Sequence, residues 1–394
     1  MRKNNLLIFI ITVFLMNLAS SMTIPVYPYL VLSLGIEMKV YGIIGTLTSL
    51  VNIALRLPFS TLIPVIGYFK SFALGISLLA LSRIFFILTA MGVYTMLMFT
   101  IGYFLSSTRF SLVMTSRSSI MARLSPKTRR GLALGSIASI GTIASSIGPF
   151  IGSFIYESTG KSFIPVFLAS ALISLIVLVL LTPLMLNDLK GEGKEVEDFT
   201  TSFKSILKVL RYEKLRISLI VFMIDAFSWS LTFMYASIYL AQVIGATSMD
   251  LATLSFLSSI VGVFGFTLAG YASDKFKNRK IFLFISELFG IVYFLIYILA
   301  RDLEPFYIAS IMMGFVMSFW GPISTAYITE RGEEISKDLI PIALGVRGFL
   351  TGLARAPGGM IGGFLYDISP ILLFETALTL ITFSSLLILF FVKE

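Results

Sequence analysis

Long apolar stretches separated by short polar segments dominate the pattern along this chain. A helix that crosses a membrane needs about 20 consecutive, mainly apolar residues, and twelve stretches meet this requirement. The pattern therefore predicts an all-α membrane protein with 12 transmembrane helices. We place them at 5–33, 40–69, 72–93, 95–121, 131–156, 163–186, 216–243, 250–272, 281–300, 305–329, 339–366 and 370–391. The first stretch is longer than the apolar part of a signal peptide, so we interpret it as an uncleaved span.

The longest polar segment, residues 187–215, divides the chain into two halves. It predicts an N-terminal six-helix bundle over 1–186, a cytoplasmic linker over 187–215 and a C-terminal six-helix bundle over 216–394. Residues 203–210 combine apolar positions (Phe203, Ile206, Leu207 and Leu210) with Lys204 and Lys208, a pattern typical of a short helix that lies on the inner membrane surface.

Lysine and arginine residues are distributed very unevenly between the two sides of the predicted membrane. If the N-terminus is cytoplasmic, the inner segments hold 21 of them, and the outer segments hold only Lys39, Lys161 and Arg301. Cytoplasmic loops carry the excess of basic residues in membrane proteins. We therefore expect a multi-pass protein of the cell membrane with both termini in the cytoplasm.

A shift of 210 residues superimposes the second half of the sequence on the first. Residues 131–157 match 341–367 without a gap at nine of 27 positions, among them Gly148 with Gly358 and Gly152 with Gly362. This similarity predicts two pseudo-symmetric bundles related by duplication, an arrangement typical of transporters that work by alternating access.

The composition agrees with a membrane protein and excludes several functions. Hydrophobic residues make up 57% of the 394 residues, and charged residues make up only 13%, about half the share in soluble domains. The absence of cysteine and histidine leaves little for catalysis or metal binding, so we expect no enzyme, no cofactor and no metal. The net charge of +9 fits basic loops that face anionic lipid better than nucleic acid.

Two local motifs stand out from the apolar background. In the fifth span, Gly148, Pro149 and Gly152 allow close helix contact and a bend. After the eighth span, Gly270 is followed by an acidic and basic turn, from which we single out Asp274, Lys275, Arg279 and Lys280. The carboxylate of Asp274 is expected to accept hydrogen bonds from a helix N-terminus, with Arg279 and Lys280 at the lipid surface.

With these motifs the chain resembles a transporter of the major facilitator superfamily over nearly its whole length. Residues 270–280 resemble the family's loop motif, with Lys277 where glycine is usual, and residues 144–152 resemble a fifth-helix motif of its antiporters. The resemblance implies two bundles that rock around a central cavity, with spans 3, 6, 9 and 12 outside it. It also implies that the two motifs belong to the gate.

Nine charged residues lie within the predicted spans, where each costs at least about 2.5–3.5 kcal/mol at the centre. The acidic ones are Asp225, Glu287 and Glu375, and the basic ones are Arg56, Arg83, Arg109, Arg117, Arg347 and Arg355. Asp225, about ten residues into the seventh span, is our candidate for proton coupling. Burial disfavours a charged carboxylate and a nearby arginine favours it, a competition that a proton carrier needs. The alternative is a static Asp–Arg pair between helices.

The other intramembrane charges divide into candidates for the cavity and candidates for the membrane boundary. Arg109, Arg355 and Arg56 lie near the middle of their spans, so they are expected to bind an anionic substrate group or to pair with Asp225. Glu287 and Glu375 lie within about six residues of span ends, so we expect their side chains to reach the membrane surface or to cap a helix.

Aromatic and amide side chains on the expected cavity spans complete the candidate substrate site. Such walls suit an amphiphilic ligand, although ordinary packing is the alternative for each residue. These candidates are Asn17, Tyr27, Trp229, Tyr235, Tyr239, Trp320 and Tyr327.

These features lead to one main functional hypothesis and two alternatives. We expect a secondary active transporter, with proton-coupled export of small amphiphilic or drug-like compounds. The excess of intramembrane arginine favours, as an alternative, transport of an organic anion or sugar-like metabolite. A non-transporting membrane receptor is the least favoured, because it has no need of duplicated, rocking halves. The expected partners are a small-molecule substrate, protons and membrane lipid, with the chain acting as a monomer.

Overall fold

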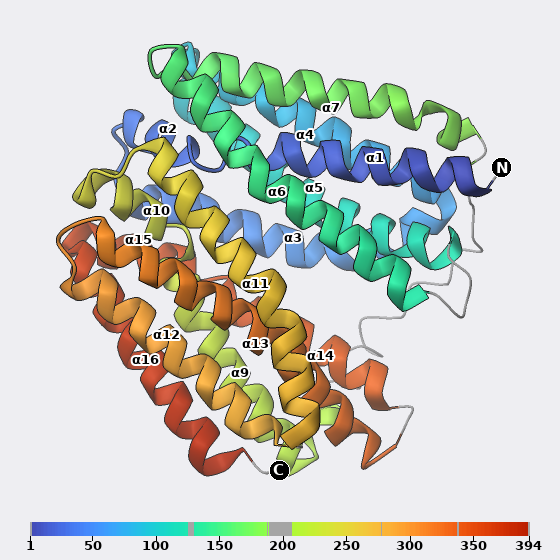
Figure 1. Ribbon diagram of the computed structural model, residues 1–394, viewed down its shortest axis with the longest axis vertical. Helices are drawn as coiled ribbons and strands as arrows, with labels where there is room; N and C mark the ends of the chain where they lie inside the picture. The colour runs from blue at the N-terminus through green and yellow to red at the C-terminus, as the bar shows by residue number, and fades with distance from the viewer. Residues whose placement is uncertain are drawn as a thin grey trace. The chain divides into compact units, whose positions relative to one another are not determined.

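The computed structural model describes residues 2–124, 130–186, 188, 207–276, 278–336 and 339–392 (Figure 1). Every regular element in these residues is helical. Eleven of the segments are long and apolar enough to cross a membrane, and residues 5–21 add a shorter apolar helix. The structure thus confirms the predicted all-α fold with twelve membrane helices.

The chain forms two compact units. The first consists of residues 1–35, 48–196 and 247–256, and the second of residues 36–47, 197–246 and 257–394. Two helices are divided between the units. Helix α3 (Met38–Ile66) begins in the second unit and continues in the first, and α11 (Ser248–Phe276) begins in the first unit and continues in the second. Most of the predicted linker lies outside the described residues, and only 207–210 of the expected surface helix are seen as helical.

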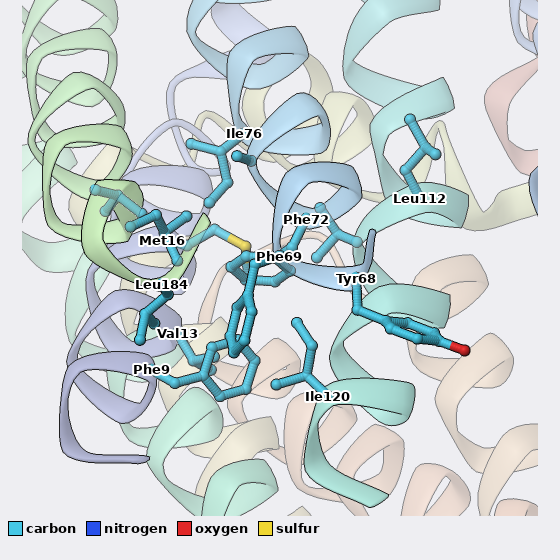
Figure 2. Close-up of a cluster of buried hydrophobic side chains, with 14 of the residues drawn as sticks. Phe9, Val13, Met16, Tyr68, Phe69, Phe72, Ile76, Leu112, Ile120 and Leu184 are labelled. Atoms are coloured by element: carbon cyan, nitrogen blue, oxygen red, sulfur yellow. The ribbon is translucent and has the colours of Figure 1, made fainter. Parts of the chain in front are cut away.

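The first unit has a core of aliphatic and aromatic side chains between its helices. Phe9 contacts the rings of Phe69 and Phe72 at centroid distances of 5.9 and 5.3 Å, and Met16 and Leu184 extend the same cluster (Figure 2). Besides most of α3, the unit contains α1 (Arg2–Ser21), α2 (Tyr27–Ser33), α4 (Tyr68–Ala90), α5 (Thr95–Leu124), α6 (Arg130–Ser158) and α7 (Phe163–Leu186).

The second unit has its own core, centred on α9 and the helices that pack on it. Phe222, Leu283, Tyr327 and Ile388 are nearly inaccessible to solvent within this cluster. Besides most of α11, the unit contains α9 (Glu213–Phe233), α10 (Ala236–Tyr239), the π-helix η2 (Leu240–Ile244), α12 (Arg279–Leu299), α13 (Glu304–Glu333), α14 (Leu339–Arg355), α15 (Gly358–Ile368) and α16 (Pro370–Phe391).

The predicted repeat is visible in the way glycines of one helix approach the backbone of another. In the first unit, a Cβ atom at Gly152 of α6 would overlap the carbonyl oxygen of Met22, just after α1. In the second unit, a Cβ atom at Gly362 of α15 would overlap the carbonyl oxygen of Leu231 in α9. Small residues allow such close contact between helices in membranes, so the matching glycines hold matching helix pairs together.

The two copies differ at their prolines. Helix α6 continues through Pro149, whereas in the second copy α14 ends at Arg355 and α15 begins only at Gly358, after Pro357. Proline removes one backbone hydrogen bond wherever it occurs in a helix. The bend expected from the proline motif thus becomes a complete break only in the second copy.

Carboxylates at corresponding positions of the repeat bind the first residues of α3 and α11. Asp367, at the end of α15, accepts hydrogen bonds from the backbone N–H groups of Met38 and Lys39, each 2.8 Å long. Glu157, at the end of α6, accepts a 2.8 Å hydrogen bond from the hydroxyl of Ser248. A negative charge is favourable at a helix N-terminus, so each carboxylate stabilises the start of a long helix.

Candidate functional site

Asp225 is buried inside the second unit, on the face of α9 that packs against neighbouring helices. Its side chain is only 2% exposed. The indole ring of Trp229, one helical turn further on, interacts with the carboxylate. The Oδ1 atom is buried without a hydrogen-bond partner among the described residues, so the carboxyl group has an oxygen that is available to hold a proton.

Two arginines of α14 contribute positive charge to the environment of Asp225. Arg355 and Arg347 both interact electrostatically with its carboxylate. The guanidinium group of Arg347 is fixed by donating to the hydroxyls of Thr325 and Ser324 at 2.7 and 2.5 Å, whereas Arg355 is exposed. Neither arginine is within ion-pair distance of Asp225 in the described contacts, so the carboxylate is influenced by positive charge without being locked to it.

Glu287 corrects the expectation that it lies near the end of its span. Helix α12 begins at Arg279, so Glu287 is two turns inside it, and its side chain is 1% exposed. The carboxylate accepts a 3.0 Å hydrogen bond from the hydroxyl of Ser384 in α16. Its side chain is therefore enclosed between helices, whereas that of Glu375 is exposed.

The first unit contains one half-buried and one buried arginine, Arg109 and Arg83, and no ion pair to them among its described residues. Arg109 of α5 donates a 2.5 Å hydrogen bond to the hydroxyl of Ser20 in α1, and its Nε atom is buried without a partner in the described contacts. Arg83 of α4 is 3% exposed and donates to Ser170 of α7 at 3.1 Å. Arg83 also lies over the rings of Phe86 and Phe167, which marks it as a packed, structural arginine.

The remaining candidates of the first unit lie on α1, α2 and α3. Asn17 is half-buried and donates to the carbonyl oxygen of Val13 at 2.7 Å. Tyr27 is half-buried in an aromatic group with Phe86 and Phe99, at centroid distances of 5.6 and 6.0 Å. Arg56 falls within α3, but its side chain lies outside the described part of the structure.

The aromatic candidates of the second unit divide into buried and partly accessible side chains. Tyr235, Tyr239 and Tyr327 are each 0% exposed within the described structure. Tyr235 donates a 2.5 Å hydrogen bond to the carbonyl oxygen of Gly359, which shows a packing role. Trp229 and Trp320 are half-buried. Membership of a substrate cavity stays a prediction for all five.

The second unit contains a groove that the sequence did not predict. It has a volume of about 610 Å³ and lies between α11 and α13. Its walls are mostly apolar. In the sequence, only the spacing of Thr325 and Thr329, one helical turn apart on α13, indicates that polar side chains lie on this face of the helix. The lining residues are Phe266, Met317, Gly321, Pro322, Thr325, Ala326, Thr329 and Glu330.

The loop motif after α11 forms a compact ionic cluster. Arg279 donates to Asp274 at 2.6 Å and to Glu330 of α13 at 2.8 Å, and it also binds the hydroxyl of Ser273. Arg279 is therefore directed toward α13 and away from the lipid position that we expected, and Glu330 is a partner that the sequence analysis missed. Lys275 is exposed beside the ring of Tyr271, and Lys280 is half-buried at the start of α12.

Comparisons with known proteins agree on one family. Residues 9–358 and 219–394 match the profile of the Major Facilitator Superfamily. The chain is 22% identical over 360 residues to the quinolone resistance protein NorA of Staphylococcus aureus (strain COL), covering 90% of this chain and 88% of that protein. It is 29% identical over 111 residues to the uncharacterized MFS-type transporter YqjV of Bacillus subtilis (strain 168), covering 28% of this chain and 27% of that protein.

Solved structures show the same fold at low sequence identity. A point mutant of the nucleoside transporter NupG superimposes with a TM-score of 0.77 at 13% identity over 98% of both chains. The human organic anion transporter MFSD10 superimposes with a TM-score of 0.65 at 15% identity over 98% of this chain and 99% of that chain. These similarities concern the fold alone.

Proposed function

We propose, from the fact that this chain belongs to the Major Facilitator Superfamily, that it exports small amphiphilic or drug-like compounds by alternating access in exchange for protons. The family and its transporter relatives identify the chain as a membrane transporter and not an enzyme. The finer statements, on the substrate and on the proton, rest on particular residues of the two units.

The observation that carries the proposal is the buried carboxyl group of Asp225. Its unpartnered Oδ1 atom lies in an apolar helix interface, near but not locked to the arginines of α14. Burial favours the neutral carboxylic acid and nearby positive charge favours the carboxylate. Small movements of α14 therefore change the preference between the two forms, which is what couples proton binding to a conformational change.

The substrate class is supported by the groove and by one relative. The walls of the groove are mostly apolar, with Thr325, Thr329 and Glu330 as polar residues, and an apolar cavity with few polar groups suits an amphiphile. The relative NorA is described as a quinolone resistance protein. A quinolone is therefore the first compound to test.

Transport in inverted membrane vesicles tests this proposal. We expect vesicles that contain the protein to accumulate a fluorescent quinolone when an inward-acidic pH gradient is present. Accumulation should stop when nigericin collapses the gradient. Gradient-independent accumulation at the same rate would contradict proton coupling, and no accumulation of any of a panel of cationic and zwitterionic drugs would contradict the substrate class.

Arg109 supports transport of an organic anion as a second candidate function. Its guanidinium group has a hydroxyl partner but no carboxylate partner in the described contacts, and a charged group within the membrane needs a partner or a function. Binding of benzoate-like anions that is lost in Arg109→Ala, retained in Asp225→Asn and independent of Arg83 would favour this function over drug export. Unchanged anion binding in Arg109→Ala would exclude it.

A further inference from the structure

The second unit contains a second buried carboxyl group, Glu287, on helix α12 beside α9. The ring of Trp229 in α9 packs on Phe294 of α12 with centroids 4.9 Å apart, and it also lies against Gly290 of α12. Asp225 is one turn before Trp229 in α9, and Glu287 is one turn before Gly290 in α12. Both carboxyl groups therefore lie one helical turn before the contact between Trp229 and Gly290.

Helix α16 contacts both α9 and α12 on the opposite side. Ile381 packs against Gly290, and Ser384, one turn further on, donates to Glu287. Ser228, next to Trp229, donates to the carbonyl oxygen of Ala377 in the same helix at 2.9 Å. Three helices thus enclose the space around the two carboxyl groups, and these interact electrostatically with each other.

The two carboxyl groups have different charged neighbours. Asp225 is influenced by Arg347 and Arg355 of α14 as well as by Glu287. Among the described residues, Glu287 has only Asp225 as a charged neighbour and Ser384 as a hydrogen-bond donor. The side of α13 that packs on α12 near this point is aromatic, with Phe315 and Phe319 against Phe289. Two adjacent negative charges in such surroundings are strongly disfavoured, and one carboxyl must hold a proton.

We propose that Glu287 is a second proton-binding residue and that it forms with Asp225 a coupled carboxyl pair that exchanges two protons in two steps. The inference deepens the proposed function, on which it rests. The pair is neutral when both carboxyls are protonated. When the first proton leaves to water, the pair carries one negative charge, which the arginines of α14 favour on Asp225. The second proton leaves only after that charge is compensated. Interacting carboxyls titrate as a pair in two macroscopic steps.

Trp229 provides a spectroscopic readout that does not depend on transport. The chain contains only two tryptophans, so Trp320→Phe leaves Trp229, which interacts with Asp225, as the single reporter. In this background we would record the tryptophan fluorescence of the purified protein between pH 4 and pH 10. The comparison covers the parent protein and the variants Asp225→Asn, Glu287→Gln and the double variant. Glu375→Gln, on exposed Glu375 of α16, is the matched control.

The inference predicts two transitions for the parent protein and for Glu375→Gln, one for each single variant of the pair, and none for the double variant. A flat profile in Asp225→Asn would overturn it, because no second group would then titrate. A transition in Asp225→Asn that persists in the double variant would also overturn it, because another group would be responsible. If Glu287→Gln does not fold, Ser384→Ala in the Asp225→Asn background replaces it. Removing this hydrogen bond must shift the midpoint of the remaining transition, and an unshifted midpoint overturns the inference.

The outcome is separable from that of the proposed function. Two coupled transitions in a protein whose drug transport ignores the pH gradient would refute proton-coupled export and leave the carboxyl pair intact. Gradient-driven export with a single fluorescence transition would refute only the pair.

Discussion

Asp225 and Glu287 illustrate what a single sequence reveals about individual residues. An aspartate ten residues into an apolar stretch must be inside a span, and the structure places it at 2% exposure. Glu287 was placed near a span end because we began its helix at residue 281, after the basic residues. The helix begins at Arg279, after Asn278, whose side chain accepts a hydrogen bond from the N–H of Ile281. Arg279 is satisfied by the carboxylates of Asp274 and Glu330, so the helix can begin at this basic residue, two positions before the expected start.

Glu334, just beyond the end of α13, gives a prediction of pH-dependent stability. Partial burial opposes its ionisation, but hydrogen bonds from Arg331 and Lys214 prevail and hold the pKa of Glu334 below its ordinary value of 4.5. A carboxyl with a lowered pKa stabilises the folded state at pH values above its ordinary pKa, and this contribution is lost as the pH falls through the lowered pKa.

We therefore expect the difference in melting temperature between the parent protein and Glu334→Gln to be present at pH 7 and to disappear as the pH falls below 4.5 and through the lowered pKa. The difference should be small, because half-exposed ion pairs contribute less than about 1 kcal/mol. Differential scanning fluorimetry in detergent measures it, with exposed Asp302→Asn as control. A difference that grows as the pH falls would contradict the lowered pKa of Glu334.

At the level of helices, the sequence predicted which elements exist better than where they are interrupted. The Gly148–Gly152 motif predicted close helix packing, and the structure identifies the partner as the end of α1 and the residues after it. The break between α14 and α15 follows from Pro357, but nothing in the sequence distinguished it from the uninterrupted helix through Pro149. Packing of neighbouring helices decides whether a proline bends or breaks a helix, and a single sequence does not contain that information.

The close contact at Gly152 predicts a large effect for a small substitution. In Gly152→Val the new side chain would overlap the backbone carbonyl of Met22, which cannot move as a flexible side chain can. Overpacking of this kind costs typically about 1–3 kcal/mol. We expect a clearly lower melting temperature, by scanning fluorimetry, than for Gly345→Val, because Gly345 has no heavy atom near its Cβ position. Equal melting temperatures of the two variants would contradict the packing described for α6.

At the level of the whole molecule, the sequence predicted the class of protein and its family from composition, span count and motifs. It did not reveal the groove between α11 and α13, because the contact between its lining residues depends on tertiary packing. The role of each candidate residue in substrate binding also stays a prediction. A side chain packed between helices and one that lines a substrate cavity can occupy the same position in a hydrophobic sequence pattern.

The orientation in the membrane is a prediction for the entire chain that cysteine labelling can check. The protein has no cysteine, so single substitutions report without background. With both termini cytoplasmic, Lys161→Cys should react with a membrane-impermeant maleimide in intact cells, and Asp274→Cys should react only after permeabilisation. Both side chains are exposed, which makes them comparable. The reverse labelling pattern would contradict the assignment based on basic loops.

The most direct test of the central claim measures proton movement driven by substrate. Purified protein would be reconstituted into proteoliposomes that contain a pH-sensitive dye, and a quinolone gradient would be imposed across the membrane. We expect the parent protein and Glu375→Gln to move protons against the quinolone flux, and Asp225→Asn to reduce proton movement strongly while still binding the drug. Proton movement by Asp225→Asn at the parent rate would show that the buried carboxyl group on α9 is not the coupling residue.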